Sequence, residues 1–452
     1  MELFSWLYDL VVIYIFPLIL VLGILVFIHE LGHFLAAKFF GVRVERFSIG
    51  FPPRLFGVQI GETDYCISAV PLGGYVKMSG MIDESLDTEQ MEQPPQDYEF
   101  RAKKTFPKVA IITAGVIMNF LLGIGIFWGV FWFEGEVVTP TTRIEVIPGE
   151  IADSLGLHSN DRFLSVNGVE VANWEDIQRE LLANLGEATV FRLVRDGQEQ
   201  EITFNWGNRE SKDLIRLGMG PLLPAKVGRL APDYPAAEAG LQSGDEIVAI
   251  GDSTIDSWSA MSRVIRANPG TLTPFRVLRD GDTLSLSITP RLVSARTAEG
   301  DSVQVGQIGI RPFYEHRRLS FWEAAKRGLS EALFLGGANI KGFGRVVSGV
   351  DNARDSLAGP LAIAKMIGDI AQESFTSLLR MMAMLSVVLA FVNILPIPAL
   401  DGGHLVIILI EGILKRPLPL RVKLVVQQVG MLLLLMLMVF IFYNDIARFL
   451  SN

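Results

Sequence analysis

Four long runs of uncharged, mostly apolar residues constrain the fold of this 452-residue chain more than any other feature. They cover residues 10–28, 109–133, 381–400 and 424–443, and the third continues past Asp401 to residue 410. Because an α-helix rises about 1.5 Å per residue, each run can cross the hydrocarbon core of a bilayer as a helix. With 50% hydrophobic residues overall, the chain is predicted to be a polytopic α-helical membrane protein with four transmembrane helices.

The basic residues beside these runs predict how the chain crosses the membrane. They cluster between runs one and two and in the loop between runs three and four, at Lys38, Arg43, Arg46, Arg54, Lys77, Arg101, Lys103, Lys104, Lys108, Lys415, Arg416, Arg421 and Lys423. Basic loops stay in the cytoplasm, so we expect both termini and residues 134–375 on the opposite side. Acidic Glu2 and Asp9 precede the first run and no small-residue cleavage site follows it, which indicates a retained helix rather than a signal peptide.

The first run ends in the motif HELGH, residues 29–33. His29 and His33 are four residues apart and share one face of a helix. Two imidazoles there can bind a zinc ion, and Glu30 can activate a water bound to it. Ionisable groups are costly at membrane depth, so the motif predicts a functional metal site. Zinc is the expected metal, although the ligand types alone would also accept iron or cobalt.

The third run ends in NILPIPALDGGH, residues 393–404. Its two prolines interrupt a regular helix, and irregular backbone at membrane depth is tolerated where it is buried in protein or lines a wet cavity. Asp401 needs a cationic partner there, and two histidines with one carboxylate would leave a fourth zinc position for water. His404 is either a fourth ligand or, as we favour, a solvent-facing or capping residue. Asn393 either binds a substrate carbonyl, which we favour, or joins helices.

An internal repeat with an offset of 84 residues follows the second run. FRLVRDG at residues 191–197 matches FRVLRDG at 275–281, and Asp161 and Trp174 match Asp245 and Trp258. Each copy predicts short strands, a hairpin turn and a helix near 174–184 or 258–267. The sequences GLHSNDRFLSVNG and GLQSGDEIVAIGD resemble PDZ domains, which bind extended peptides. Peptide capture and steric gating remain equally open. Cys66 is the only cysteine, so no intramolecular disulfide is possible.

Taken together, HELGH, NxxPxPxLDGG and the tandem PDZ-like segments resemble the site-2 protease family of intramembrane zinc metalloproteases. The resemblance implies that His29, His33 and Asp401 bind zinc, that Glu30 is the general base and that Asn393 binds substrate. It further implies cleavage of single-span membrane proteins, such as a pre-trimmed anti-sigma factor or remnant signal peptides, in regulated intramembrane proteolysis of an envelope stress response. The expected location is a bacterial inner membrane, with lipid and peptide C-termini as further partners and no nucleic acid.

Smaller matches concern the segment between the first two runs and the second run itself. GGYVKM at residues 73–78 and RFSIGF at 46–51 resemble the family's membrane re-entrant β-hairpin and its companion segment. Gly115 and Asn119 resemble the family's GPxxN, with Val116 where proline is usual. We expect the edge of residues 65–70 to accept the unwound substrate as an added strand, which makes Ile67, Ser68, Ala69 and Val70 candidate substrate-binding residues.

These observations divide the chain into eight segments. They are 1–40 with HELGH, 41–107 with the hairpin, the second helix at 108–133, PDZ-like domains at 134–215 and 216–312, linker helices at 313–375, the third helix at 376–412 and the fourth at 422–448. Residues 321–335 predict either an amphipathic helix on the membrane or a linker helix packed on the PDZ-like domains. The acidic residues 83–99 predict a solvated loop rather than a docking site. The rival functions are a non-catalytic membrane scaffold and a zinc transporter.

Overall fold

The computed structural model describes residues 10–81, 94–206, 209–210, 213–214, 217–296, 302–356 and 358–451. The chain forms two compact units, one built from Met1–Gly135 and Arg318–Asn452 and the other from Glu136–Arg317. Most of the predicted acidic loop, residues 82–93, lies outside the described residues.

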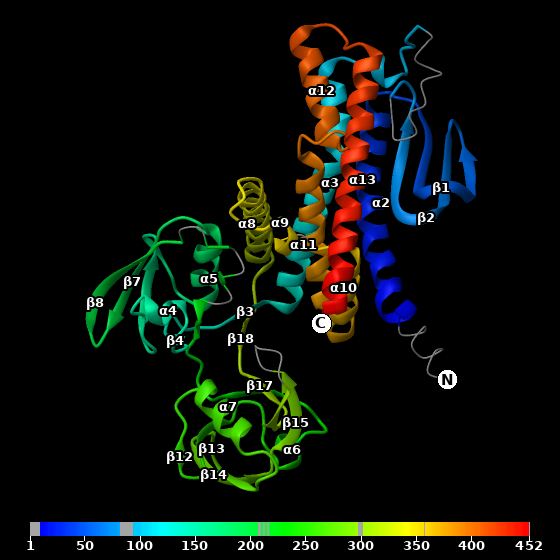
Figure 1. Ribbon diagram of the computed structural model, residues 1–452. Helices are drawn as coiled ribbons and strands as arrows, with labels where there is room; N and C mark the ends of the chain where they lie inside the picture. Colours follow the sequence, from blue (N-terminus) through cyan, green and yellow to red (C-terminus); the bar gives the residue numbers. More distant parts are fainter. Residues whose placement is uncertain are drawn as a thin grey trace. The chain divides into compact units, whose positions relative to one another are not determined.

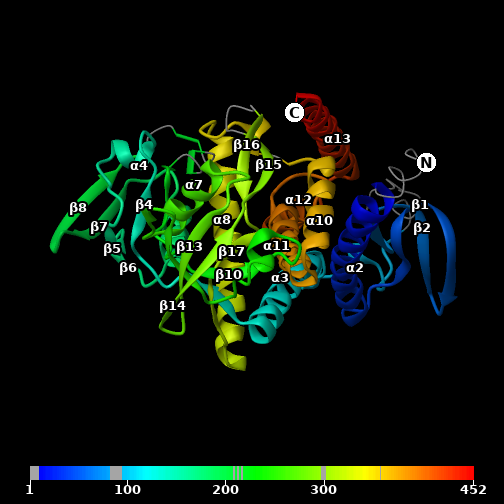
Figure 2. The same cartoon turned by 90° about the horizontal axis from the view of Figure 1, so that it is seen from below.

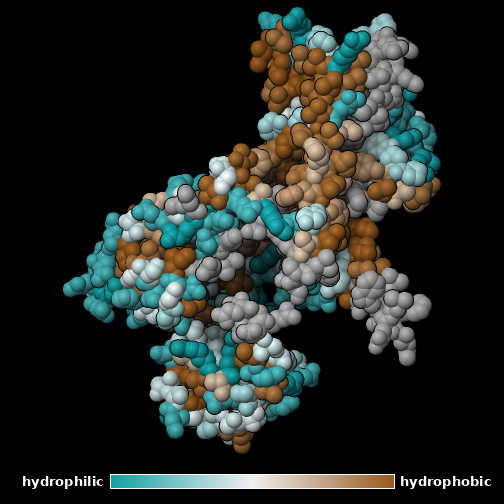
Figure 3. Space-filling model, in the orientation of Figure 1, coloured by the Kyte–Doolittle hydropathy of each residue, from teal (hydrophilic) through white to brown (hydrophobic). Residues whose placement is uncertain are grey.

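Within the described residues, the first unit contains four helices that are long and apolar enough to cross a membrane, as predicted (Figure 1). The first is a short π-helix, Leu10–Ile15, that continues into α2 (Phe16–Phe39). The others are α3 (Thr105–Glu134), α11 (Phe375–Ile394) and α13 (Leu420–Ser451). Many of their leucine, valine and isoleucine side chains are exposed, and Figure 3 shows the apolar surface that they form over the bundle. Such a surface suits contact with lipid.

Helix α3 packs against α2, α11, α8 and α12. Small residues allow the close approach: a Cβ atom on Gly32 of α2 would lie 2.5 Å from the Ala114 carbonyl oxygen, and one on Gly123 would lie 2.8 Å from Val387 of α11. Ser386 also donates a hydrogen bond of 2.7 Å to the Asn119 carbonyl oxygen of α3. Small residues and interhelical hydrogen bonds are the usual means of packing helices in membranes.

The remaining helices of this unit connect the long ones. They are the 3₁₀ turn Phe100–Ala102, α8 (Phe321–Val347), α9 (Ala353–Ser356), α10 (Pro360–Glu373) and α12 (Asp401–Leu414). Helix α8 begins with a capping box between Ser320 and Glu323 and packs on α3, where Gly328 meets the Trp128 backbone. Its inward contacts are therefore with the helical unit, while Trp322, Leu333 and Ile340 are exposed.

Two long bent strands, β1 (Val44–Ile60) and β2 (Thr63–Met78), lie beside α2 in both ribbon views (Figures 1 and 2). The first half of β1, residues 44–51, pairs with both the beginning and the end of β2, because Ser48 lies opposite Cys66 and also opposite Tyr75. The second half of β1, residues 54–60, folds back onto the beginning of β2, so that Phe56 lies opposite Ile67 and Gly57 opposite Cys66. In effect the two strands make a four-ribbon sheet, ordered 54–60, 63–70, 44–51, 74–78.

This register corrects one prediction. Residues 65–68 do not offer a free edge, because Ile67 is flanked by Ile49 on one side and by Phe56 on the other. Ser68 is buried and its Oγ atom lies 2.8 Å from Ser48 Oγ, whereas Ile67 and Ala69 are exposed. Val70 is exposed as well. Among the described residues, the outer edges of this sheet belong to 54–60 and 74–78.

The second unit repeats one set of elements at the predicted 84-residue offset. The first copy comprises α4 (Ile151–Ser154), β5 (Arg162–Val166), β6 (Val169–Glu170), α5 (Trp174–Ala183), β7 (Thr189–Arg195) and β8 (Gln198–Phe204). The second comprises α6 (Pro235–Glu238), β11 (Glu246–Ile250), β12 (Ser253–Thr254), α7 (Trp258–Ala267), β13 (Thr273–Arg279) and β14 (Asp282–Ile288). Each forms a four-stranded sheet, β6-β5-β7-β8 or β12-β11-β13-β14, around its own apolar core.

Short antiparallel pairs complete the second unit. They are β4 (Ile144–Val146) with β9 (Met219–Pro221), β10 (Val227–Leu230) with β17 (Ile310–Pro312), β15 (Arg291–Arg296) with β16 (Ser302–Gln307), and β3 (Glu136–Val138) with β18 (Glu315–Arg317). The last pair joins the two ends of the unit. The predicted hairpin turns occur at Asp196 and Asp280, which both have positive φ.

An equivalent arginine–aspartate ion pair stabilises each of the two copies. Arg195 Nη2 lies 2.6 Å from Asp161 and donates to the Gly156 carbonyl oxygen, and Arg279 makes the equivalent contacts with Asp245 and Gly240. Burial alone would raise the pKa of Asp245, but its hydrogen bonds from Arg279 and Gln242 outweigh that effect and hold the pKa below its usual value. The pair therefore stabilises the second copy above that usual pKa, and this contribution is lost as the pH falls through the lowered value.

Candidate metal centre

Three candidate ligands converge inside the helical unit. His29 and His33 lie one turn apart on α2, and Asp401 is the first residue of α12. The two histidines are only 8% and 6% exposed. Among the described residues, these three form the group of histidine, cysteine and acidic side chains whose ligand atoms could hold a metal ion. His404 is outside this group.

The spacing of the three ligand atoms fits a tetrahedral zinc ion. Asp401 Oδ2 lies 3.1 Å from His29 Nε2 and 3.3 Å from His33 Nε2, and the two nitrogens are 3.2 Å apart. Zinc–ligand bonds of about 2.0–2.1 Å give a tetrahedron whose edges are about 3.3–3.4 Å. Asp401 Oδ2 is also buried with no hydrogen-bond partner. A buried carboxylate oxygen without a hydrogen bond is costly, and a cation bound between this oxygen and the two ring nitrogens would remove that cost.

A backbone carbonyl sets the protonation of His33. Its Nδ1 atom lies 2.9 Å from the Ile111 carbonyl oxygen of α3, which can only accept a hydrogen bond. Nδ1 therefore carries the hydrogen, and in the neutral ring Nε2 presents a lone pair to the other two ligand atoms. Helix α3 thus orients His33 for metal binding.

Asn119 of α3 has the corresponding position beside His29. It is fully buried, its amide nitrogen lies 3.3 Å from His29 Nδ1, and its Oδ1 atom has no hydrogen-bond partner. The two ends of an amide have nearly the same shape, so the opposite amide orientation would let Oδ1 accept the Nδ1 hydrogen. That orientation pairs Oδ1 and leaves the His29 Nε2 lone pair for the metal.

Gly115 of α3 makes room for both imidazoles. A Cβ atom there would overlap His33 Nε2 and lie 2.9 Å from His29 Nε2. Helix α3 runs without a break through Val116, so the absence of the family's proline does not disturb this packing. In the sequence, Gly115 and Asn119 were recognised only as part of a motif. Their contacts with the two histidines could not be predicted from it and are seen in the structure.

The interrupted segment between α11 and α12 places Asp401. Ala399 has a φ of 74°, and residues 395–400 fold back over the start of α12. Side chains at Gly402 and Gly403 would overlap the carbonyl oxygens of residues 394, 395 and 397, so these positions need glycine. Gly430 of α13 makes a similarly close contact with Pro398. The prolines and glycines of the motif therefore shape a compact turn that turns Asp401 towards α2.

A cavity of about 370 Å³ opens onto the three ligands. Glu30 and Asn393 line it, and Asn393 Nδ2 lies 3.4 Å from His29 Nε2. Residues 73–76 and Met78, from the edge strand of the sheet, line it as well. The candidate substrate residues Ile67, Ser68, Ala69 and Val70 are not part of this lining. A three-ligand site with a carboxylate and an amide in one cavity is suited to hydrolysis of a carbonyl compound.

Comparison with known proteins agrees with this chemistry. Residues 17–437 match the family described as Peptidase family M50. The chain belongs to this family. Among M50 relatives, the Escherichia coli protein named Regulator of sigma-E protease RseP is 31% identical over 465 residues, covering 98% of this chain and 99% of that protein. A Neisseria meningitidis relative described as a zinc metalloprotease is 32% identical, covering 95% of this chain and 97% of its own length. The predicted resemblance to the site-2 protease family is therefore confirmed.

Proposed function

We propose that this M50 peptidase is a zinc endopeptidase that cuts single-span membrane proteins within their transmembrane segment. The observation that carries the proposal is the His29, His33 and Asp401 triangle, which shares a cavity with Glu30 among apolar helices. Relatives named as regulators of sigma-E support a role in an envelope stress response, with an anti-sigma factor or remnant signal peptides as substrates. The location proposed on the same grounds is the inner membrane.

The site residues divide the work of hydrolysis. His29, His33 and Asp401 would hold a zinc ion, which when bound would polarise the scissile carbonyl and acidify a water molecule. Glu30 would take a proton from the attacking water and deliver it to the leaving amine. The Asn393 amide donates a hydrogen bond to the substrate backbone. The buried contacts from Ile111 and Asn119 keep both imidazoles in the orientation that this chemistry needs.

A membrane helix must unwind before its peptide bonds can be cut, and the unwound strand needs new hydrogen-bond partners. The edge at residues 74–78 supports this role better than residues 65–70, because it lines the cavity and has a strand on one side only among the described residues. We therefore assign strand addition to this edge. The exposed Leu55, Phe56, Val58 and Ile60 on the opposite edge support insertion of the sheet into the membrane as a re-entrant element.

Cross-linking tests the assigned edge without relying on activity. In a Cys66→Ser, Glu30→Gln background, Tyr75→Cys should form a disulfide with a cysteine placed near the scissile position of a single-span reporter. Val58→Cys, on the far edge of the same sheet, should not. The disulfide yield is measured on non-reducing gels. A higher yield from Val58→Cys than from Tyr75→Cys would contradict the assignment.

The tandem repeat is proposed to form two PDZ-like domains, residues 134–215 and 216–312, outside the cytoplasm. The basic residues between the first two apolar runs and in the loop between the last two support this orientation, with both termini on the same side of the membrane as the PDZ-like domains. The domains act as a filter that excludes substrates with bulky extracytoplasmic parts, or they bind peptide C-termini.

Removal of the second unit tests the filter. A chain with residues 136–317 replaced by a short Gly/Ser linker should cut a reporter that retains a folded extracytoplasmic domain, whereas the intact chain should cut only the trimmed form. Cleavage of the trimmed reporter by the shortened chain is the control for folding. If the shortened chain cuts only the trimmed reporter, the filter role is wrong.

Metal removal tests the proposed function as a whole. Reconstituted protein treated with a zinc chelator should lose cleavage of a trimmed single-span reporter, and one equivalent of zinc should restore it. Cleavage that survives with less than a tenth of an equivalent of bound zinc would overturn the proposal.

The number of ligands disfavours the alternative that the protein is a non-catalytic scaffold. A closed structural zinc site would need four protein ligands, and three converge among the described residues.

A further inference from the structure

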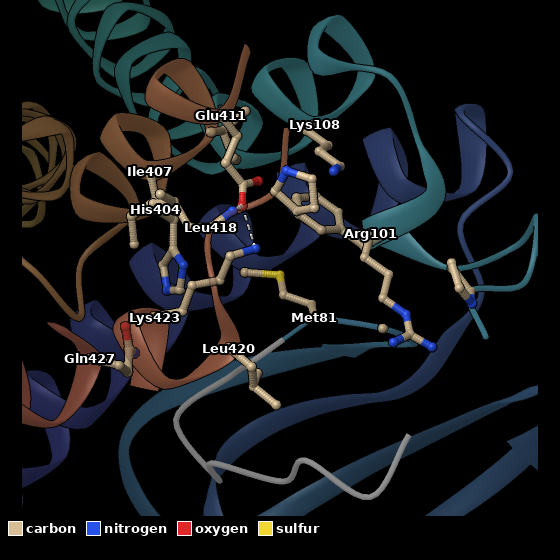
Figure 4. A pocket seen from close by; sticks show the side chains of 15 residues that line it. Met81, Arg101, Lys108, His404, Ile407, Glu411, Leu418, Leu420, Lys423 and Gln427 are labelled. Carbon is tan, nitrogen blue, oxygen red and sulfur yellow. Dashed lines mark hydrogen bonds and ion pairs between the residues drawn. The ribbon is translucent and has the colours of Figure 1, made fainter. Parts of the chain in front are cut away.

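A second cavity, of about 330 Å³, lies at the basic end of the helical unit (Figure 4). Its walls come from α3, α12, α13 and the turn around Phe100. It meets the catalytic cavity at Met81 and His404, which line both. None of the three candidate zinc ligands lines it, so its role is separate from the metal centre.

The surroundings of this cavity are strongly cationic. An adjoining hollow that shares Glu411 and part of the basic lining presents Arg101, Lys103, Lys104, Lys108, Lys415 and Arg416. Glu411 is the acidic residue in the lining of either hollow, as far as the chain is described. Figure 4 shows its carboxylate directed at Lys423, whose Nζ atom lies 2.6 Å away, and it also accepts the Leu418 N–H.

Lys108 has no such partner. Its side chain is half-buried beside the Phe100 ring, and no ion pair joins it to the described residues. A half-buried ammonium group is stabilised by an anion, and among the described residues the one carboxylate that lines the cavity is paired with Lys423. As far as the chain is described, Lys108 can therefore accommodate a further negative charge beside it.

Gln427 of α13 adds an independent observation. Its side chain lines the cavity on the His404 side (Figure 4), it is 3% exposed, and its Nε2 atom has no hydrogen-bond partner. A buried N–H donor without an acceptor is costly and points to a group that the cavity takes up. An anionic oxygen would pair with Lys108, and another acceptor oxygen of the same ligand would satisfy Gln427 on the other side of the cavity (Figure 4).

We propose that this cavity binds the phosphate of an anionic phospholipid from the adjoining leaflet. Two further features favour a lipid over a soluble phosphate ester. Met81, Ile407 and Leu420 give the cavity an apolar wall that suits the glycerol and first acyl carbons. The cavity also opens at the end of helices that cross the membrane, where basic pockets between helices bind lipid headgroups. The proposal rests on the membrane-spanning fold and not on the peptidase activity.

The test uses delipidated full-length protein in neutral detergent, titrated with phosphatidylglycerol and followed by native mass spectrometry. Lys108→Gln should weaken phosphatidylglycerol binding about fivefold. Adding Gln427→Leu to this variant should weaken the binding further, whereas Lys108→Arg alone should retain the affinity of the wild type. Lys38→Gln removes the same charge at the end of α2, where Lys38 pairs with Glu62, and should have no effect. Unchanged melting temperatures without lipid exclude misfolding.

Three results would overturn the proposal. Equal weakening by Lys38→Gln would mean that surface charge attracts the lipid without a defined site. Equal binding of phosphatidylcholine and phosphatidylglycerol would mean that the cavity does not select an anion. Displacement of phosphatidylglycerol by millimolar inorganic phosphate or glycerol 3-phosphate would assign the site to a soluble phosphate.

Discussion

Glu30→Gln should lower the rate of reporter cleavage by about a thousandfold or more while leaving the zinc content at one equivalent. The amide has nearly the size of the carboxylate but cannot take a proton from the attacking water. Glu30 lines the cavity without belonging to the three-atom ligand group, so the metal should remain bound. Single-turnover cleavage of a trimmed reporter and metal analysis of the same sample give both numbers.

Two companion variants make this result interpretable. Asp401→Ala should lose both the metal and the activity, because it removes one corner of the ligand triangle. Glu62→Gln changes an exposed glutamate that pairs with Lys38 and should cut at the normal rate. If Glu30→Gln cut the reporter within threefold of the wild type, Glu30 would not be the general base.

Gly115→Ala should reduce zinc affinity by about a hundredfold or more and abolish cleavage at ordinary zinc concentrations. The added methyl group would occupy the space of His33 Nε2 and crowd His29 Nε2, so the two nitrogens could not keep their present separation. The measurement is competition for zinc against a fluorescent chelator, followed by the cleavage assay at saturating zinc.

Helix α3 offers a matched control for this substitution. Gly125 is exposed on the same helix, and a Cβ atom there would meet no atom within 4 Å. Gly125→Ala should therefore leave zinc affinity and cleavage unchanged, and it should raise the helix propensity equally. Normal zinc affinity in Gly115→Ala would show that the imidazoles do not depend on this glycine.

Much of this architecture could be predicted from the chain because its signals are local. Uncharged runs of about 20 residues predict spanning helices, HELGH places two imidazoles on one helical face, and the 84-residue repeat appears as equal element spacings. The interruption of the helix before Asp401 could also be predicted, since Pro396 and Pro398 cannot continue a helix.

The errors and omissions concern contacts between distant residues. The pairing of β1 and β2 was misjudged because alternation along a strand says which side chains share a face but not how many neighbours the strand has. The return of residues 54–60 onto 63–68 covers the edge that we had assigned to substrate. The contacts of Asn119 and Gly115 with the two histidines join positions about 80–90 residues apart, and no local pattern encodes them.

The central claim is that this M50 peptidase hydrolyses a peptide bond inside the membrane. The most direct measurement is the position of the cut in a trimmed single-span reporter, co-reconstituted with the protein in liposomes and read by mass spectrometry of both products. We predict one cut within the apolar span, absent with Glu30→Gln. A cut confined to the polar flanks of the reporter, equally sensitive to Glu30→Gln, would contradict the claim and assign the metal centre to hydrolysis outside the bilayer.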